Sequence, residues 1–309
     1  MSRKRLLIQT AVILTALTVT AASVCADDDN RGNGNGNGNG NGGSAAGLVP
    51  VPSNNSSCAG LPSYTALKTA LVNAVAAESS GLNNQMWATL VDRNGVVCAV
   101  AFSGTNRAAQ WPGSRVISAQ KANTANSFSL DLSSNSNGSG QPNGLSLSTA
   151  NLFSAVQPGG SLFGLQASNP VDTDVAYHGS SNNYGTANDP MVGEKIGGVN
   201  VFGGGLTLYA TGHLVVGGLG VSGDTSCADH FIAWRLRHAL GFDHMGATNA
   251  LAAVPGPASL FGGDPTHPDN IIFDISPNPS GGVGVSASGF GHPTCLNTGN
   301  QKALPDVAP

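Results

Sequence analysis

Two apolar runs joined by a tight-turn sequence constrain the fold of this chain most strongly. Residues 86–92 and 96–102 are rich in Val, Ala, Leu and Phe, and Arg93-Asn94-Gly95 lies between them. Asn-Gly is the dipeptide that favours the short turn of a β-hairpin. The sequence therefore predicts an antiparallel hairpin here, and the rest of the fold has to be built around it.

Helical spacing and turn residues place the other elements. Leu67, Leu71 and Val75 recur at helical intervals, with Ser63 suited to cap the start and Gly81 following the end. The remaining predicted elements are a helix at 112–128, strands at 198–202, 206–210 and 213–221, and a helix at 224–240. This order predicts an α+β fold in which an antiparallel sheet is flanked by helices.

One long segment between these elements has no clear periodicity. Residues 129–196 are rich in Ser, Asn, Gly and Pro. A stretch of this length without regular structure is uncommon inside a domain, so we interpret it as a long insertion with a functional or assembly role.

The N-terminus has the features of export. Three cations at 3–5 precede an apolar run and a small-residue site ending at Ala26, which is the pattern of a secretory signal peptide over residues 1–26. Residues 27–57 contain an alternating Gly-Asn tract that cannot bury apolar surface, so they are expected to form a disordered tail. We therefore predict that residues 58–309 form a single domain and that the protein is periplasmic or extracellular.

Composition and cysteine content narrow the class of partner. Only 10% of residues are charged and the formal net charge is −4, so nucleic acid is not an expected partner. No stable membrane insertion is expected either, because the one apolar run is too short and lies in the leader. Four cysteines lie in the predicted domain and allow three pairings, of which we favour Cys58–Cys98 with Cys227–Cys295. Free buried thiols are the alternative.

Two motifs resemble known sites without completing them. The Gly218–Gly223 segment matches the glycine pattern of a dinucleotide site, but the expected hairpin context lacks the parallel βαβ unit that such a site needs. The His238–His244 segment resembles half of a zinc protease motif, but Trp234 and Arg235 stand where the first His and the Glu would be. Both activities are therefore rejected.

Polar residues concentrate around the helix expected at 224–240. Asp224 suits its first turn, while His230 and Trp234 share a face by four-residue spacing. Glycines at a strand end that meets a helix N-terminus offer backbone N–H groups to an anion. The candidate ligand-binding residues are Lys121, Thr124, Gly220, Gly223, Asp224, Asp229, His230 and Trp234. A solvated surface lysine and an ordinary boundary histidine are the alternatives for Lys121 and His230.

Several of these segments together resemble one family. The matching stretches are Leu90–Gly95, Gln120–Ala125, Gly197–Val199, Gly217–Asp224 and Ala228–His230, in this order. They are similar to the GlcG/HbpS-type haem-binding family, also described as haem-degrading domains. The resemblance implies a profilin-like sandwich, a homo-oligomer and haem as cofactor. It also implies Thr124 as a ligand of the haem iron, and we add His230 as a second candidate ligand.

These features lead to three hypotheses about function, which experiments can distinguish. The first is an exported protein that binds haem or a related tetrapyrrole for capture, storage or sensing. The second is an enzyme of haem degradation or organic-acid turnover that uses Asp229 and His230 as an acid–base pair. The third is an oligomeric structural module. The sequence leaves open whether the chain is an enzyme, and it assigns no catalytic residue.

Overall fold

A computed structural model describes residues 57–130, 145–245, 264, 266–282 and 284–309. The predicted signal peptide, and all but the last residue of the predicted tail, lie outside the described residues. Within the described part, one four-stranded sheet carries the fold, with strand order β2-β1-β4-β3 and every neighbouring pair antiparallel. The strands are β1 (Trp87–Asp92), β2 (Val97–Phe102), β3 (Gly205–Ala210) and β4 (Leu214–Ser222).

The predicted hairpin is confirmed as β1 and β2, and Asp92 closes its turn. One carboxylate oxygen of Asp92 accepts hydrogen bonds from the backbone N–H groups of Asn94 and Val96, each at 2.8 Å. Gly95 has a φ of 79°, a conformation that glycine adopts without strain. The turn sequence therefore sets the register from which the sheet is built.

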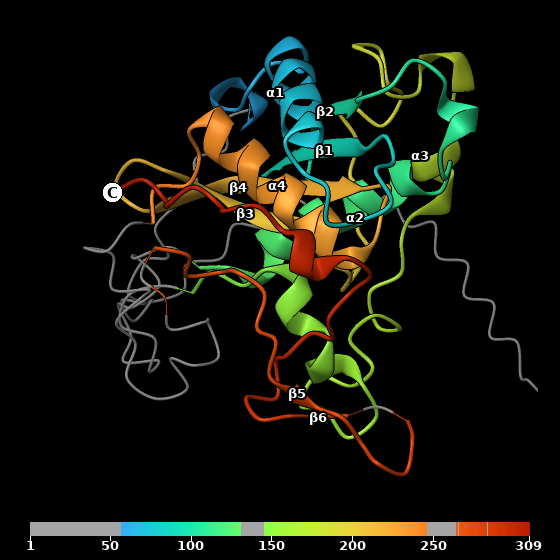
Figure 1. Cartoon of the computed structure of the whole chain (residues 1–309). Coiled ribbons are helices and arrows are strands. Elements are labelled where there is room, and N and C mark those ends of the chain that lie inside the picture. The colour runs from blue at the N-terminus through green and yellow to red at the C-terminus, as the bar shows by residue number, and fades with distance from the viewer. Residues whose placement is uncertain (1–56, 131–144, 246–263, 265, 283) are drawn as a thin grey trace, which may run out of the picture. The chain divides into compact units, whose positions relative to one another are not determined.

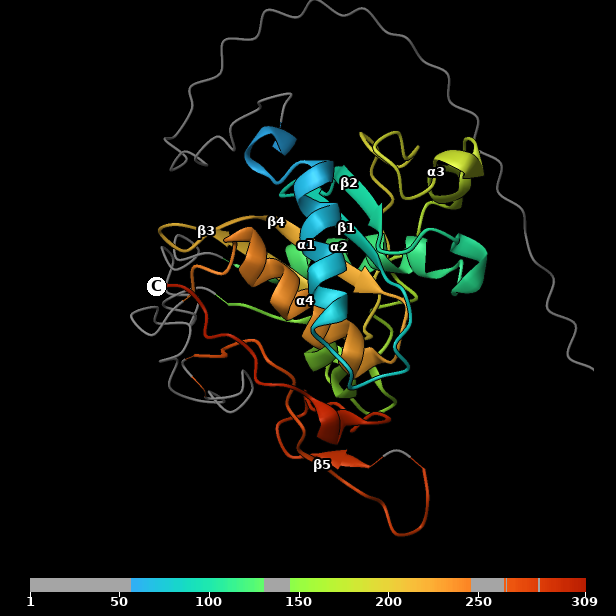
Figure 2. The ribbon, with the colours of Figure 1, turned by 45° about the horizontal axis from the view of Figure 1, so that its top comes forward.

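Helices cover both faces of this sheet (Figure 1). α2 (Ser114–Phe128) lies against β1, β4 and β3 on one face, while α1 (Tyr64–Ala76) and α4 (Ser226–Leu240) pack against each other on the opposite face, as Figure 2 shows. Ser63 caps α1 by accepting from the Ala66 N–H, as predicted. The smaller elements are α3 (Thr173–Tyr177), β5 (Ile275–Ser276), β6 (Val285–Ser286) and 3-10 helices at Ser57–Gly60, Arg107–Ala109, Thr149–Leu152, Ser154–Val156, Ser181–Asn183 and Thr298–Asn300. The α+β class predicted from the sequence is confirmed.

The glycines of β4 let α2 approach the sheet closely. A Cβ atom on Gly220 would lie 1.8 Å from the Ser118 carbonyl oxygen, and one on Gly218 would lie 2.2 Å from the Ala122 carbonyl oxygen. Any side chain at these positions would collide with the helix backbone. The glycine-rich pattern thus serves helix–sheet packing at these two positions.

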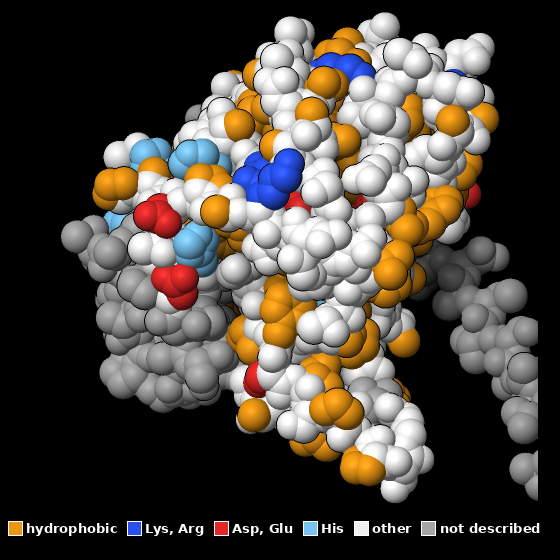
Figure 3. Space-filling view, in the orientation of Figure 1, with side chains coloured by type: hydrophobic (Ala, Val, Ile, Leu, Met, Phe, Trp, Pro, Cys, Tyr) orange, Lys and Arg blue, Asp and Glu red, His pale blue; other side chains and the backbone are white. Residues whose placement is uncertain are grey.

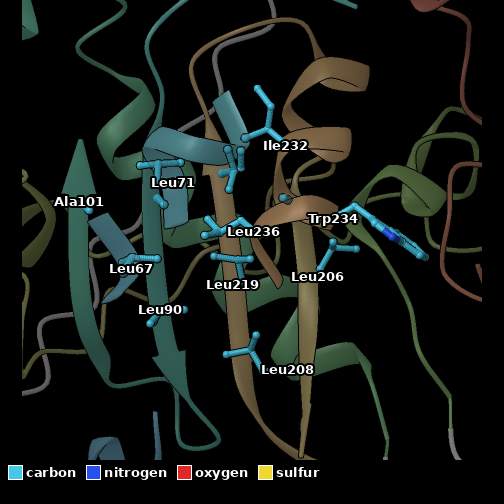
Figure 4. Close-up of a cluster of buried hydrophobic side chains, with 14 of the residues drawn as sticks. Leu67, Leu71, Leu90, Ala101, Leu206, Leu208, Leu219, Ile232, Trp234 and Leu236 are labelled. Carbon is cyan, nitrogen blue, oxygen red and sulfur yellow. The ribbon is translucent and has the colours of Figure 1, made fainter. Parts of the chain in front are cut away.

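Apolar side chains fill both faces of the sheet. On the α1/α4 face, Leu67 and Leu71 of α1 meet Leu90, Leu219 and neighbouring strand residues (Figure 4). On the α2 face the buried cluster contains Trp87, Val91, Val97, Val100, Phe102, Val116, Ala119, Ala122, Ala176, Met191 and Ile196. Burial of apolar area on both faces is the main stabilising contribution to such a fold.

The structure refines one expectation about the middle of the chain and corrects another. Part of the predicted insertion belongs to the core, because Ala176, Met191 and Ile196 pack with the strands on the α2 face. Residues 198–202 do not form a strand, because side chains rather than a neighbouring strand satisfy their backbone: the Asn200 N–H donates to Thr124 Oγ1 at 3.0 Å. Of the insertion, 131–144 lie outside the described residues.

Both favoured disulfides are present. Cys58–Cys98 links the N-terminal 3-10 helix to β2, and Cys227–Cys295 links α4 to the C-terminal segment at 264–309. A buried ion pair reinforces the second link, because the two terminal guanidinium nitrogens of Arg237 lie 2.6 and 2.7 Å from the carboxylate oxygens of Asp269. The C-terminal segment is therefore fixed along α4.

The surface reflects the low charge content of the sequence. On the face in Figure 3, charged side chains are few and hydrophobic ones are scattered among uncharged polar residues. No helix in the described ranges combines the length and hydropathy needed to cross a membrane.

Candidate functional site

Lys121 and Asp229, predicted as ligand residues, form a buried ion pair. Lys121 Nζ lies 2.6 Å from Asp229 Oδ2 and donates to the Val221 carbonyl oxygen at 3.0 Å. The other oxygen of Asp229 accepts from the Asp224 N–H at 2.9 Å. Burial raises the pKa of Asp229 to about 7 and lowers that of Lys121, and each charge partly offsets the cost for the other. Both groups are thus committed to joining α2 to α4.

The other predicted residues near the start of α4 also have internal partners. Thr124 Oγ1 donates to the Gln120 carbonyl at 2.7 Å and accepts from the Asn200 N–H. Asp224 accepts from the Leu82 and Asn84 N–H groups, at 2.8 and 3.1 Å. Their hydrogen-bonding capacity therefore serves the fold in this conformation.

The two predicted glycines have no free space beside them. Gly220 lies against α2, as described above, and a Cβ atom on Gly223 would lie 2.6 Å from the Gln85 carbonyl oxygen. A cavity of about 50 Å³ borders Asp224, which is large enough for water but not for an organic ligand. No anion cradle is formed at this strand end among the described residues.

His230 and Trp234 share a face of α4 as predicted, with ring centroids 6.1 Å apart. Trp234 Nε1 donates to the Pro305 carbonyl at 2.9 Å, so the C-terminal segment covers this face. His230 is fully buried, and burial lowers its pKa to about 3. Asn270 is close enough to influence that pKa, yet neither ring nitrogen completes a hydrogen bond with a described residue. Their roles as ligands of a cofactor remain predictions.

A cavity of about 810 Å³ lies elsewhere, at the N-terminal end of α2. Trp87 opens β1, Arg107 belongs to the 3-10 helix after β2, Val116 lies in the first turn of α2, and Tyr177 and Tyr184 come from the predicted insertion. Three of the seven Trp and Tyr residues of the chain line this one cavity. It is within the size range of about 300–1,000 Å³ that is typical of small-molecule sites.

Hydrogen bonds and stacking hold the walls of this cavity in place. Tyr184 Oη donates to the Tyr177 carbonyl at 2.9 Å, and the Arg115 guanidinium lies 3.6 Å from the centroid of the Tyr184 ring. Arg115 is itself paired with buried Asp189. Trp87 Nε1 donates to Gln110 Oε1 at 2.6 Å. The aromatic rings are therefore preorganised.

Arg107, at the edge of the cavity, has N–H groups that are not engaged by described residues. Arg107 donates from Nη1 to the Tyr184 carbonyl at 2.9 Å and is only partly buried, whereas Arg115 has its guanidinium engaged by Asp189, Ala176 and Tyr184. The sequence signal for this site was the presence of tyrosines inside a Ser/Asn/Gly-rich stretch. That signal does not reveal which strand or helix they would face.

Comparison with known proteins places this fold in a family. A family model described as "Haem degrading protein HbpS-like" matches residues 65–236, which is more than half of the chain. The chain therefore belongs to the HbpS-like haem-degrading protein family, and the resemblance inferred from its sequence motifs is confirmed. The matched span contains every residue that lines the 810 Å³ cavity.

Two solved structures are similar to this chain. One is titled "Crystal Structure of PduOC:Heme Complex", with a TM-score of 0.36 and 21% identity over 57% of this chain and 89% of that chain. The other is the Klebsiella pneumoniae protein ORFY, of family model DUF336, with a TM-score of 0.35 and 23% identity over 58% of this chain and 90% of that chain. A search of the curated proteins finds no significant match.

Proposed function

We propose that this chain is an exported protein that binds haem, or a closely related tetrapyrrole, in the cavity between Trp87 and Tyr184. The observation that carries the proposal is the coincidence of family membership with an aromatic-walled cavity of about 810 Å³ inside the matched span. A planar macrocycle with two carboxylates needs flat apolar walls and a nearby cation. Trp87, Tyr184 and Arg107 supply these groups.

The residues present fit the ligand chemically. The Tyr184 ring would pack against the macrocycle together with the small exposed part of the otherwise buried Trp87 ring, and the unengaged N–H groups of Arg107 would bind a propionate. Tyr177, whose hydroxyl forms no hydrogen bond with a described residue, would supply an oxygen ligand of the kind that ferric haem accepts. Haem bound in this way would be captured or stored.

A haemin titration of the full chain tests the proposal. The expected result is a saturable shift of the Soret band with one equivalent of haemin, accompanied by quenching of tryptophan fluorescence. Absence of any shift at micromolar haemin would overturn it. Tyr177→Phe should change the visible spectrum of the complex.

Export has a separate test. The leader pattern and the two disulfides support it, because disulfides persist in oxidising compartments. N-terminal sequencing of the chain from its native host should begin at Asp27. A cytoplasmic chain that retains residues 1–26 would contradict export without affecting haem binding.

A further inference from the structure

The start of α4 and the C-terminal segment carry two matching pairs of metal-ligating residues. On α4, Cys227 and His230 are three residues apart, and on the C-terminal segment His292 and Cys295 are three residues apart. The disulfide Cys227–Cys295, with Cα atoms 5.9 Å apart, brings the two pairs together. Two cysteines and two histidines form one of the usual ligand sets of a tetrahedral structural zinc site.

Three of the four side chains already converge. The Sγ atoms of Cys227 and Cys295 and a ring nitrogen of His292 all lie within 4.8 Å of one another, and His292 Nδ1 is 3.9 Å from Cys227 Sγ. Cys227 and His292 are buried, whereas Cys295 is partly exposed and leaves a route for an ion from solvent.

A second polar group supports His292 from behind. His292 Nε2 lies 2.7 Å from Ser226 Oγ, and the same hydroxyl oxygen accepts from the Gly203 N–H at 2.6 Å. A histidine that binds a metal through one ring nitrogen is commonly held by a hydrogen bond from the other. In the disulfide-bonded structure His292 Nδ1 lies 2.6 Å from the Pro293 carbonyl oxygen, which can only accept, so Nδ1 carries the ring proton there. When Nδ1 is the ligating atom this contact is given up, and Ser226 Oγ accepts the hydrogen bond from Nε2.

His230 supplies an independent sign that a ligand is missing. It is fully buried, it lies one helical turn from Cys227, and the Asn270 side chain beside it comes close without either ring nitrogen completing a hydrogen bond of good geometry with a described residue. Buried polar atoms nearly always have a partner, and each exception needs an explanation such as an unseen water or ion. His292 is near enough to act on His230 electrostatically.

We propose that reduction of the Cys227–Cys295 disulfide converts this cluster into a binding site for Zn²⁺, with Cys227, Cys295 and His292 as ligands and His230 as the fourth. A dithiol reductant supplies two electrons and two protons, which break the S–S bond and give two thiols. Zn²⁺ then displaces both thiol protons and binds two thiolates. His292 stays neutral: its proton moves from Nδ1, where it bonds the Pro293 carbonyl, to Nε2, which then donates to Ser226 Oγ.

The two states would hold the same segments together by different bonds. The disulfide joins α4 to the C-terminal segment when oxidised, and the metal joins them when reduced. Oxidation of the two thiolates by a disulfide oxidant, which takes up the two electrons and is reduced to two thiols, would therefore re-form the Cys227–Cys295 bond and release Zn²⁺ to solvent. This site lies on the opposite side of the sheet from α2, and its function does not depend on haem binding at Trp87 and Tyr184.

Cobalt binding to the untagged full chain provides the test. After reduction, one equivalent of Co²⁺ should give the strong visible bands of a tetrahedral site and a thiolate-to-cobalt charge-transfer band, and Zn²⁺ should displace it. The disulfide-bonded chain and the Cys227→Ser/Cys295→Ser variant should give neither band. The matched Cys58→Ser/Cys98→Ser variant, which removes the other disulfide, should keep both. His292→Ala and His230→Ala should each weaken binding by at least about tenfold.

A second measurement covers the case in which reduction or a substitution loosens the fold. Alkylation of the reduced chain, mapped by mass spectrometry, should be slowed by Zn²⁺ at Cys227 and Cys295 but not at Cys58 and Cys98. Equal protection of all four thiols, cobalt bands that persist in Cys227→Ser/Cys295→Ser, or no cobalt bands in the reduced wild type would each overturn the proposal.

Discussion

Lys121 and Asp229 form an ion pair that joins helices on opposite faces of the sheet. Lys121 belongs to α2 and Asp229 to α4, and the 2.6 Å contact passes the end of β4, where Lys121 also donates to the Val221 carbonyl. Removal of one partner from such a pair leaves the other charge buried and unpaired, which is more costly than loss of the pair itself.

Lys121→Met should therefore destabilise the chain by about 3–5 kcal/mol in urea unfolding. The double variant Lys121→Met/Asp229→Leu, which removes both charges, should recover a large part of that loss. A single variant as stable as the wild type, or a double variant no better than the single one, would show that the pair is not a buried charge–charge contact in solution.

Acidification should destabilise the disulfide-bonded chain through His230. The pKa of this side chain is lowered from 6.5 to about 3 by burial, so the unfolded state binds a proton between these pH values while the folded state does not. Stability from His230 is complete above about pH 6.5 and is lost as pH falls towards 3, by about 1.4 kcal/mol per unit. His230→Asn should reduce this slope in chemical unfolding experiments, whereas His178→Asn, at an exposed position, should retain it. An unchanged slope in His230→Asn would contradict the burial of this ring.

Arg107 should contribute to haem affinity through its charge. Arg107→Ala should weaken haemin binding by about three- to tenfold, the effect of a partly exposed charge pair worth about 1 kcal/mol. Lys195→Ala, an exposed cation that does not line the cavity, is the matched control and should bind as the wild type does. Equal weakening in both variants would indicate a general effect of net charge.

Local signals in the sequence were sufficient for the sheet and its helices. The turn at Arg93-Asn94-Gly95, the Ser63 cap and the cysteine positions each act over short distances or through few alternatives, and the structure confirms all three. The strand predicted at 198–202 does not form, because side chains of α2 hydrogen-bond to the backbone of this segment. The hydrophobic pattern of the sequence carries no sign of such contacts.

The candidate site could not be predicted in the same way. Its walls come from Trp87, Arg107 and Tyr184, residues separated by tens of positions and brought together only by packing of the insertion on α2. The glycines at 218–223 instead suggested an anion site, because a glycine that admits a ligand and one that admits a helix look identical in sequence. At Gly220 the helix is what approaches.

Blocking the cavity is the most direct test of the central claim that haem binds between Trp87 and Tyr184. Gly113 lines the cavity, and a Cβ atom there, as at remote Gly60, meets no atom within 4 Å. Haemin titrations should show at least about tenfold weaker binding in Gly113→Trp and wild-type binding in Gly60→Trp. Undiminished binding in a folded Gly113→Trp variant would show that haem binds elsewhere and contradict the account.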